Sequence, residues 1–228
     1  MVVSIHQPNY FPWLGYFYKI SKSDVFVLLD DVQFSNEGMH NYHYIKTPQG
    51  SLRLKIPVDQ HTGDLIMNVK TKDFLGWKQK HIKTIEANYK KSAFFSTVFN
   101  DYVQLIDREY NNLSEMNASI IEFILVKFEI ETKIIKSSEL NIASTKEEKV
   151  MDICIALNAT TYYSGTGAKA YQNESDFNSR GLQLSYSVFK SFEYKQLWGS
   201  FQSNVTVLDY LMNCGYDWQQ VVDKQNTM

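Results

Sequence analysis

Residues 2–31, with the sequence VVSIHQPNYFPWLGYFYKISKSDVFVLLDD, determine the predicted fold. The β-branched run at 2–5 predicts a short buried strand. Apolar residues with helical spacing over 13–21 predict a short helix, and the nearly continuous apolar run at 25–29 predicts a second strand. A strand with so few polar positions is typical of a parallel sheet that is covered on both faces. The stretch therefore predicts a βαβ unit.

The rest of the chain extends this unit into one α/β domain. We predict an antiparallel hairpin insertion at about 40–70 and a helical section at about 74–128, because the pattern changes from alternation to helical spacing there. Further strands are predicted within 131–140, 160–165 and 182–189, and helices over 144–159 and 203–215. No linker or repeat interrupts the 228 residues. The expected fold is a Rossmann-like, mainly parallel sheet with helices on both faces.

Composition excludes several classes of function. The formal net charge of −2 gives no overall basic field, so a DNA partner is not expected. Cys154 and Cys214 have neither CxxC nor metal-site spacing, so no metal is predicted, and they are typical of a reducing compartment. No signal-peptide pattern and no apolar run of about 20 residues is present. We therefore expect a cytoplasmic protein without a membrane span.

Polar side chains follow three of the predicted strands, at 6–10, at 30–33 and at 164–167. Ligands of open α/β sheets bind beyond the carboxyl ends of the strands, so these segments are the candidate site. His6 is suited to act as a general base or as a neutral hydrogen-bonding group. The alternative is a structural histidine that holds the loop at 8–12. Gln7 and Asn9 have amides that suit sugar hydroxyls or a nucleobase edge, and local turn bonding is an equal alternative.

Two other strand ends allow a functional and a structural interpretation. Asp30 and Asp31 suit Mg²⁺, a cationic amine or a base, but neighbours on a strand point to opposite faces, so only one of them faces a given pocket. The alternative is a strand end that reaches water. Gly165 and Gly167 allow an anion-binding loop, and a sharp turn with positive φ is the favoured interpretation.

The hairpin and the first long helix are interpreted as mostly structural. His40 and His43 have no third metal ligand nearby, and Lys46, Arg53 and Lys55 are expected to be solvated strand charges. Trp77, His81, Ile85 and Tyr89 recur every four positions and predict a packing face. The lysines between 78 and 91 predict a solvated face, with contact to a carrier protein or a tRNA as the alternative.

The first unit also resembles that of nucleotidylyltransferases with the HIGH motif, although Tyr16 stands after Gly15 where their second histidine is expected. A closer resemblance extends over nearly the whole chain. The segments IHQPNYFPWLGYF (5–17), DDVQF (30–34), IKTPQG (45–50) with LKIPV (54–58), IEANYKK (85–91), TTYYSGTGAKAY (160–171) and LDYLMNCG (208–215) are similar, in this order, to those of the WbqC-like family. That family is associated with bacterial surface-polysaccharide gene clusters, especially for O-antigens that contain amino sugars.

The resemblance implies work on nucleotide-linked sugars, with transfer of an acyl or aminoacyl (glycyl-type) group to a sugar amine. His6 and Asp31 are then the expected catalytic residues. The expected substrate-binding residues are Gln7, Asn9, Tyr10, Trp13, Tyr16, Gln33, Asn41, Lys46, Ser164, Gly165 and Gly167. One departure is that His40 and Tyr42 flank Asn41, where arginines are expected in many members.

Three hypotheses follow. The first is an acyl or aminoacyl transferase whose partners are a nucleotide-linked amino sugar and an acyl or aminoacyl donor, with a carrier protein or a tRNA as candidate donors and no cofactor. The second is a nucleotidylyltransferase-like enzyme on the same core. The third is a non-catalytic carbohydrate- or nucleotide-sugar-binding protein, for which an aromatic-rich opening segment is suited by stacking on sugar faces.

Overall fold

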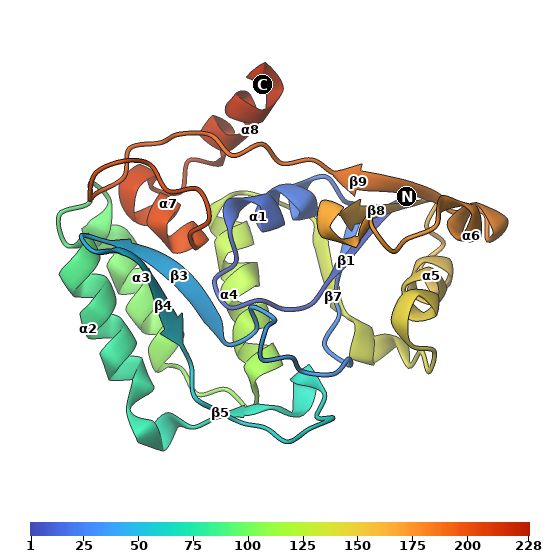
Figure 1. Cartoon of the computed structure of the whole chain (residues 1–228), viewed down its shortest axis with the longest axis horizontal. Coiled ribbons are helices and arrows are strands. Elements are labelled where there is room, and N and C mark those ends of the chain that lie inside the picture. Colours follow the sequence, from blue (N-terminus) through green and yellow to red (C-terminus); the bar gives the residue numbers. More distant parts are fainter.

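The computed structural model describes residues 1–228 and contains a five-stranded sheet in the order β7-β2-β1-β8-β9 (Figure 1). All four strand pairs in this sheet are parallel. The strands are β1 (Val2–His6), β2 (Val25–Leu28), β7 (Lys133–Lys136), β8 (Thr161–Gly165) and β9 (Gln183–Ser187). The chain builds outward from β1 to β2 and β7, then returns to add β8 and β9 on the other side. The order of the strands therefore reverses between β1 and β8, and a crevice forms there.

Helices cover both faces of the sheet, as the sequence predicted. Phe26 and Leu28 of β2 pack in the larger core with α1 (Leu14–Ser21) and α4 (Leu113–Lys127). Val25 and Val27, on the alternate face, pack in a second core with α5 (Lys146–Ala156) and α6 (Glu174–Ser179). Figure 1 shows these two helix pairs on opposite sides of the strands. The predicted α/β fold class is confirmed.

The segment between β2 and β7 contains the predicted hairpin and helical section. The hairpin is formed by β3 (Tyr42–Thr47) and β4 (Gly50–Lys55), paired antiparallel. The helices are α2 (Trp77–Tyr89), α3 (Phe95–Asp107) and α4.

The insertion predicted at about 40–70 is not one continuous hairpin. Ile66–Asn68 form a 3₁₀ turn, and the short β6 (Lys70–Thr71) pairs with β5 (Val58–Asp59) in a separate ribbon. Pro57 lacks an N–H to continue the ladder after β4, and Ile66 is fully buried in the larger core.

Two features of the helices were not predicted. Helix α4 begins one residue after Asn112, whose Oδ1 accepts a hydrogen bond from the Glu115 backbone N–H at 2.8 Å, so Asn112 is its N-cap. After α7 (Val207–Cys214), a further helix, α8 (Trp218–Thr227), was not predicted. Only Val221 of α8 is buried, so this helix contributes little to the core. None of the helices is both long and apolar enough to cross a membrane.

Candidate functional site

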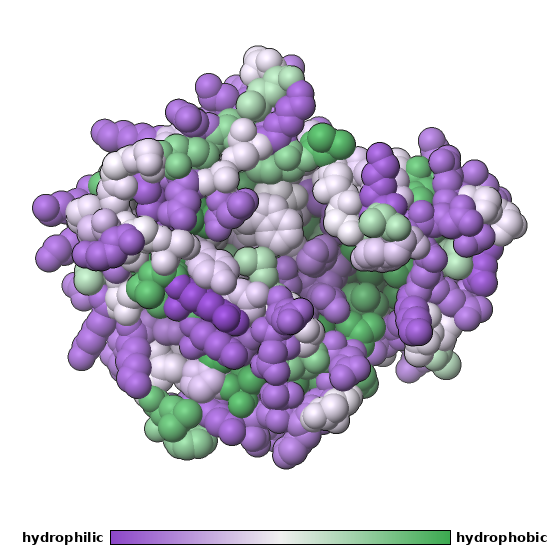
Figure 2. Space-filling view, viewed as in Figure 1, coloured by the Kyte–Doolittle hydropathy of each residue, from purple (hydrophilic) through white to green (hydrophobic).

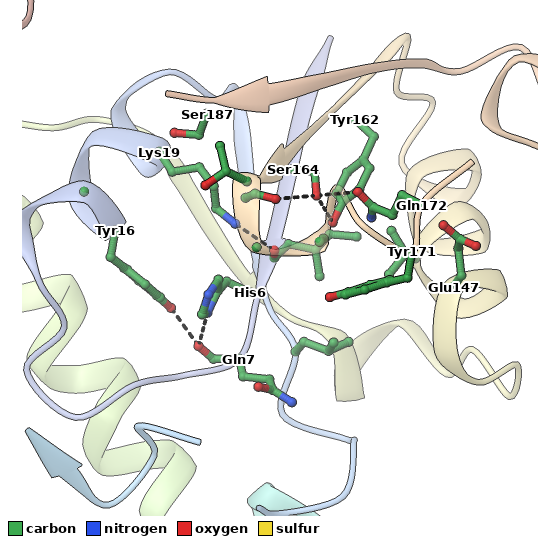
Figure 3. A pocket seen from close by; sticks show the side chains of 18 of the residues that line it. His6, Gln7, Tyr16, Lys19, Glu147, Tyr162, Ser164, Tyr171, Gln172 and Ser187 are labelled. Atoms are coloured by element: carbon green, nitrogen blue, oxygen red, sulfur yellow. Dashed lines mark hydrogen bonds between the residues drawn. The ribbon is translucent and has the colours of Figure 1, made fainter. Parts of the chain in front are cut away.

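A pocket of about 890 Å³ lies at the carboxyl ends of β1, β8 and β9, where the strand order reverses. Figure 2 shows the molecule hollowed between the part with the hairpin and the part with α5 and α6. Ile5, Leu29 and Val150 give the pocket an apolar portion, and polar side chains from β1, α1, β8 and α5 complete its wall (Figure 3). A deep, partly apolar pocket with a few converging polar groups is the usual form of a small-molecule site.

His6 is the last residue of β1 and lines this pocket. Side chains alternate along a strand, so His6 lies on the face that α1 covers, opposite Ile5. Its Nδ1 is 3.0 Å from the Gln7 carbonyl oxygen, and the Tyr16 hydroxyl donates to the same oxygen at 3.0 Å (Figure 3). Because a carbonyl oxygen only accepts, the proton of His6 resides on Nδ1. Nε2 therefore has a free lone pair and acts as an acceptor.

The imidazole of His6 is neutral at physiological pH. Burial lowers its pKa to about 3, and the nearby positive charge of Lys19 acts in the same direction. The Nδ1 bond to Gln7 opposes this shift without overcoming it. A group with so low a pKa accepts hydrogen bonds but takes up a proton only weakly near pH 7.

Lys19 of α1 lines the same pocket and was missed in the sequence. Its side chain is 4% exposed, and its Nζ donates to the Ile5 carbonyl oxygen at 3.0 Å. Burial lowers the pKa of this amine to about 7. The available signal was spacing, since Lys19 follows Gly15 by four positions and so shares its helix face.

Two aromatic side chains pack closely against Gly15 at the start of α1. A Cβ at this position would lie 2.6 Å from the Trp13 indole nitrogen and 3.0 Å from the Phe189 ring. Trp13 is 37% exposed and lines the pocket beside His6, with the two ring centroids 6.1 Å apart. Gly15 is therefore required for close packing at the pocket wall, and Trp13 is free to contact a ligand.

The loop after β8 forms another wall. Ser164, Gly165 and Gly167 all line the pocket, and the Ser164 hydroxyl donates to Gln172 Oε1 at 2.9 Å. The expectation of a sharp turn with positive φ is wrong, because neither glycine is among the residues with positive φ. A Cβ on either would meet nothing within 4 Å. Neither backbone strain nor protein packing therefore explains these glycines, and both leave open space beside the pocket.

The first turn of α5 provides the opposite wall, which the sequence prediction did not include. Glu147 lines the pocket there, and its Oε1 is buried without a hydrogen-bond partner. Burial raises the pKa of this carboxyl, and Asp176 adds to the effect. The preceding Lys146 has a φ of 56°, a strained value of the kind that collects at ligand sites. Figure 3 shows Glu147 across the pocket from Lys19.

The aspartates after β2 do not line the pocket. The Asp31 carboxylate pairs with Lys149 Nζ at 2.7 Å and accepts a hydrogen bond from the Ser137 hydroxyl at 2.5 Å. Asp30 is 2% exposed and accepts bonds from Ser137 and Ser138. Hydrogen bonds to both carboxylates therefore connect the end of β2 to the segment after β7. The alternative of a strand end that reaches water is wrong for Asp30.

Other predicted substrate-binding residues lie apart from the pocket. Asn9 and Tyr10 are buried, and Tyr10 stacks on His43 with ring centroids 4.7 Å apart. Asn41 is fully buried, and its amide donates to the Ile56 carbonyl oxygen. Gln33 is exposed and forms an isolated bridge with residue 65.

Lys46 is not the solvated strand charge that was expected. It is 4% exposed, and its Nζ donates to Gln196 Oε1 at 3.1 Å and to the Ser200 carbonyl oxygen at 2.6 Å. These bonds fasten the segment between β9 and α7 to the hairpin. The predicted stripe on α2 is a packing face, because all four of its residues are buried.

The fold and the pocket define an α/β protein with a ligand crevice at the point where the strand order reverses. The model of the WbqC-like protein family matches residues 7–221, and the chain belongs to this family. A relative, the uncharacterized protein Rv1507c of Mycobacterium tuberculosis (strain ATCC 25618 / H37Rv), is 31% identical over 217 residues, which cover 93% of this chain and 94% of the relative. The comparison with solved structures gives no significant match.

Proposed function

We propose that this protein is a transferase of surface-polysaccharide biosynthesis that joins an acyl or aminoacyl (glycyl-type) group to the amine of a nucleotide-linked amino sugar. The observation that supports it most is the pocket of about 890 Å³ between the ends of β1 and β8. Crevices at this position are the usual nucleotide-binding sites of open α/β sheets. The resemblance to a family associated with amino-sugar polysaccharides supports the choice of substrate.

The proposed pose uses the open loop for the diphosphate. Gly165 and Gly167 leave space through which phosphate oxygens approach backbone N–H groups, as glycine-rich loops allow. The sugar then lies toward His6 and Gln7, with Trp13 at its side for stacking on the ring face.

Glu147 offers a polar contact on the wall opposite Lys19. A buried carboxylate oxygen without a partner is costly, and an O–H or N–H group of the bound ligand supplies the missing donor.

His6 keeps a role in this proposal, but not the predicted one of base. Its neutral ring presents the Nε2 lone pair, which holds a sugar hydroxyl in place. Asp31 receives no catalytic role, because its carboxylate is paired with Lys149 and does not line the pocket.

The test is turnover measured by mass spectrometry. Purified protein is incubated with a panel of UDP- and dTDP-linked amino sugars, each with an aminoacyl-tRNA, an acyl carrier protein thioester or a coenzyme A thioester. We expect one combination to yield a nucleotide sugar heavier by the acyl group less one hydrogen, which is the mass of the carboxylic acid less water. The matched control is the same nucleotide sugar with a hydroxyl in place of the amine, which should stay unmodified. Unchanged amino sugars with every donor would contradict the proposal.

A nucleotidylyltransferase-like activity remains the second candidate, because His6 stands at the end of the first strand beside the pocket where such enzymes bind a nucleotide. It predicts release of pyrophosphate from a nucleoside triphosphate and a sugar phosphate. A non-catalytic carbohydrate-binding protein would instead bind the amino sugar without turnover in either assay.

A further inference from the structure

We propose that Lys19 is the catalytic residue that removes the proton from the attacking sugar amine, an inference that rests on the proposed function. Lys19 is buried, lines the pocket and lies on α1, whose N-terminal residues Gly15 and Tyr16 line the same pocket. Figure 3 shows its amine between the end of β1 and the loop after β8.

Comparison with the other buried lysines sets Lys19 apart. Lys149 pairs with a carboxylate and also donates to a backbone carbonyl. Lys46 donates to three oxygen atoms. Lys19 has a single hydrogen-bond partner, the Ile5 carbonyl oxygen, and forms no ion pair. A buried ammonium has three N–H groups to satisfy, so this environment favours the neutral amine.

The neutral form has the geometry of a base. With one N–H directed at Ile5, Nζ keeps a second hydrogen and a lone pair. The ring of Phe26 has its centroid 5.5 Å from Nζ, which is a weak cation–π contact with the ammonium and supplies no hydrogen-bond acceptor. The lowered pKa of about 7 places the amine where a base works best at neutral pH. The other titratable groups that line the pocket are His6, Tyr16, Lys146, Glu147, Tyr162 and Tyr171.

The proposed step conserves atoms and charge. The sugar nitrogen forms a bond to the carbonyl carbon of the acyl donor, and the bond from that carbon to the donor oxygen or sulfur breaks. The lone pair of Lys19 Nζ takes the proton that leaves the sugar nitrogen. The resulting ammonium then returns this proton to the departing oxygen or sulfur, and Lys19 ends the cycle neutral.

The first experiment measures the lysine itself and needs no activity. Protein labelled with ¹³C,¹⁵N-lysine is titrated by NMR, and the Lys19 signal is assigned by its loss in Lys19→Met. We expect this signal to titrate with a midpoint near 7. An amine that stays protonated above pH 9 would overturn the role of Lys19, whether or not the protein is a transferase.

The second experiment uses the turnover assay. Lys19→Met should lower kcat by about 100-fold or more, the usual contribution of a positioned base, while the dissociation constant of the nucleotide sugar changes less than about threefold. In the unaltered protein kcat should rise as the pH increases through about 7, and in Lys19→Met this rise should be absent. Lys19→Arg should not restore activity, because arginine does not lose its proton. Lys22→Met, which replaces an exposed lysine just after α1, is the matched control and should keep both rate and pH profile.

The outcomes separate the two proposals. Turnover that is lost in Lys19→Met with binding retained supports the role of Lys19. Turnover with an unchanged pH profile in Lys19→Met overturns that role and leaves the transferase proposal intact. Absence of turnover in the unaltered protein with every donor overturns both, even if Lys19 titrates near 7.

Discussion

His6 shows how the environment of one residue decides its chemistry. A histidine at the end of a strand suggested a base, but burial and Lys19 hold its pKa at about 3 and the Gln7 carbonyl fixes its tautomer. It is therefore better suited to accept a hydrogen bond than a proton. The carbonyl of Gln7, rather than its amide side chain, performs the positioning.

His6→Phe tests this role. The substitution keeps a ring beside Tyr16 but removes the Nε2 acceptor. Affinity for the nucleotide-linked amino sugar should fall about fivefold, since a hydrogen bond contributes about 1 kcal/mol. Isothermal titration calorimetry measures the change, with thermal unfolding as the check on folding. Unaltered affinity and activity would remove His6 from the site.

At the scale of elements, the strand ends were predictable and the details of their contacts were not. The strand patterns at β1, β2 and β8 located the sheet, and the polar residues His6, Gln7 and Ser164 at the ends of β1 and β8 line one pocket. Asp31 after β2 does not line it, because its carboxylate pairs with Lys149 of α5. Such pairings depend on tertiary contacts that local patterns do not encode.

Lys19 and Glu147 were missed for the same reason. Lys19 is the one charged residue of α1 and shares the helix face of Gly15, but its burial depends on tertiary contacts. Glu147 stands in the first turn of α5, where acidic residues are ordinary. Their importance follows from the crevice between β1 and β8, which brings α1 and α5 to opposite walls. Lys46 differs from them, because the sequence suggested a solvated charge and the structure buries it in a hydrogen-bond network away from the pocket.

The loop after β8 gives a prediction at this scale. Gly167→Val fills open space without backbone strain, so stability should hold within about 0.5 kcal/mol while ligand affinity falls at least tenfold. Gly181→Ala is the matched control, because Gly181 has a φ of 74° and does not line the pocket. It should lose about 1 kcal/mol of stability and keep affinity. Equal affinity in the unaltered protein and Gly167→Val would show that the space is not used.

The segment between β9 and α7 gives another prediction at the scale of elements. Lys46→Met removes the bonds to Gln196 and Ser200 and leaves Asp209 without a nearby positive charge. The free energy of unfolding should fall by about 2–3 kcal/mol, as expected when hydrogen bonds to a buried charged group are lost. Urea denaturation measures it. A stability equal to that of the unaltered protein would mean that the network contributes nothing.

At the scale of the whole molecule, the buried histidines make the fold sensitive to acid. Burial lowers the pKa of His40 and His81 to about 4, that of His6 to about 3 and that of His43 well below its ordinary value of 6.5. Below pH 6.5 the unfolded chain takes up protons that the folded chain refuses, so acidification favours unfolding.

We expect the free energy of unfolding to fall by several kcal/mol between pH 6.5 and 4.5, at up to ~1.4 kcal/mol per histidine and pH unit. The pKa values of Asp209 and Glu147 are raised, so these two carboxyls favour the folded state on acidification. They offset the loss only in part, because four histidines act in the opposite direction. Urea denaturation at pH 6.5, 5.5 and 4.5 gives the slope. A stability that is constant or rises over this range would contradict the prediction.

The most direct test of the account is a crystal structure with the nucleotide-linked amino sugar that the turnover assay identifies. We predict that the sugar lies between the ends of β1 and β8, with its diphosphate over Gly165 and Gly167 and its amine within hydrogen-bond distance of Lys19. A ligand bound elsewhere on the molecule, or in this pocket with its amine directed to solvent, would contradict the account.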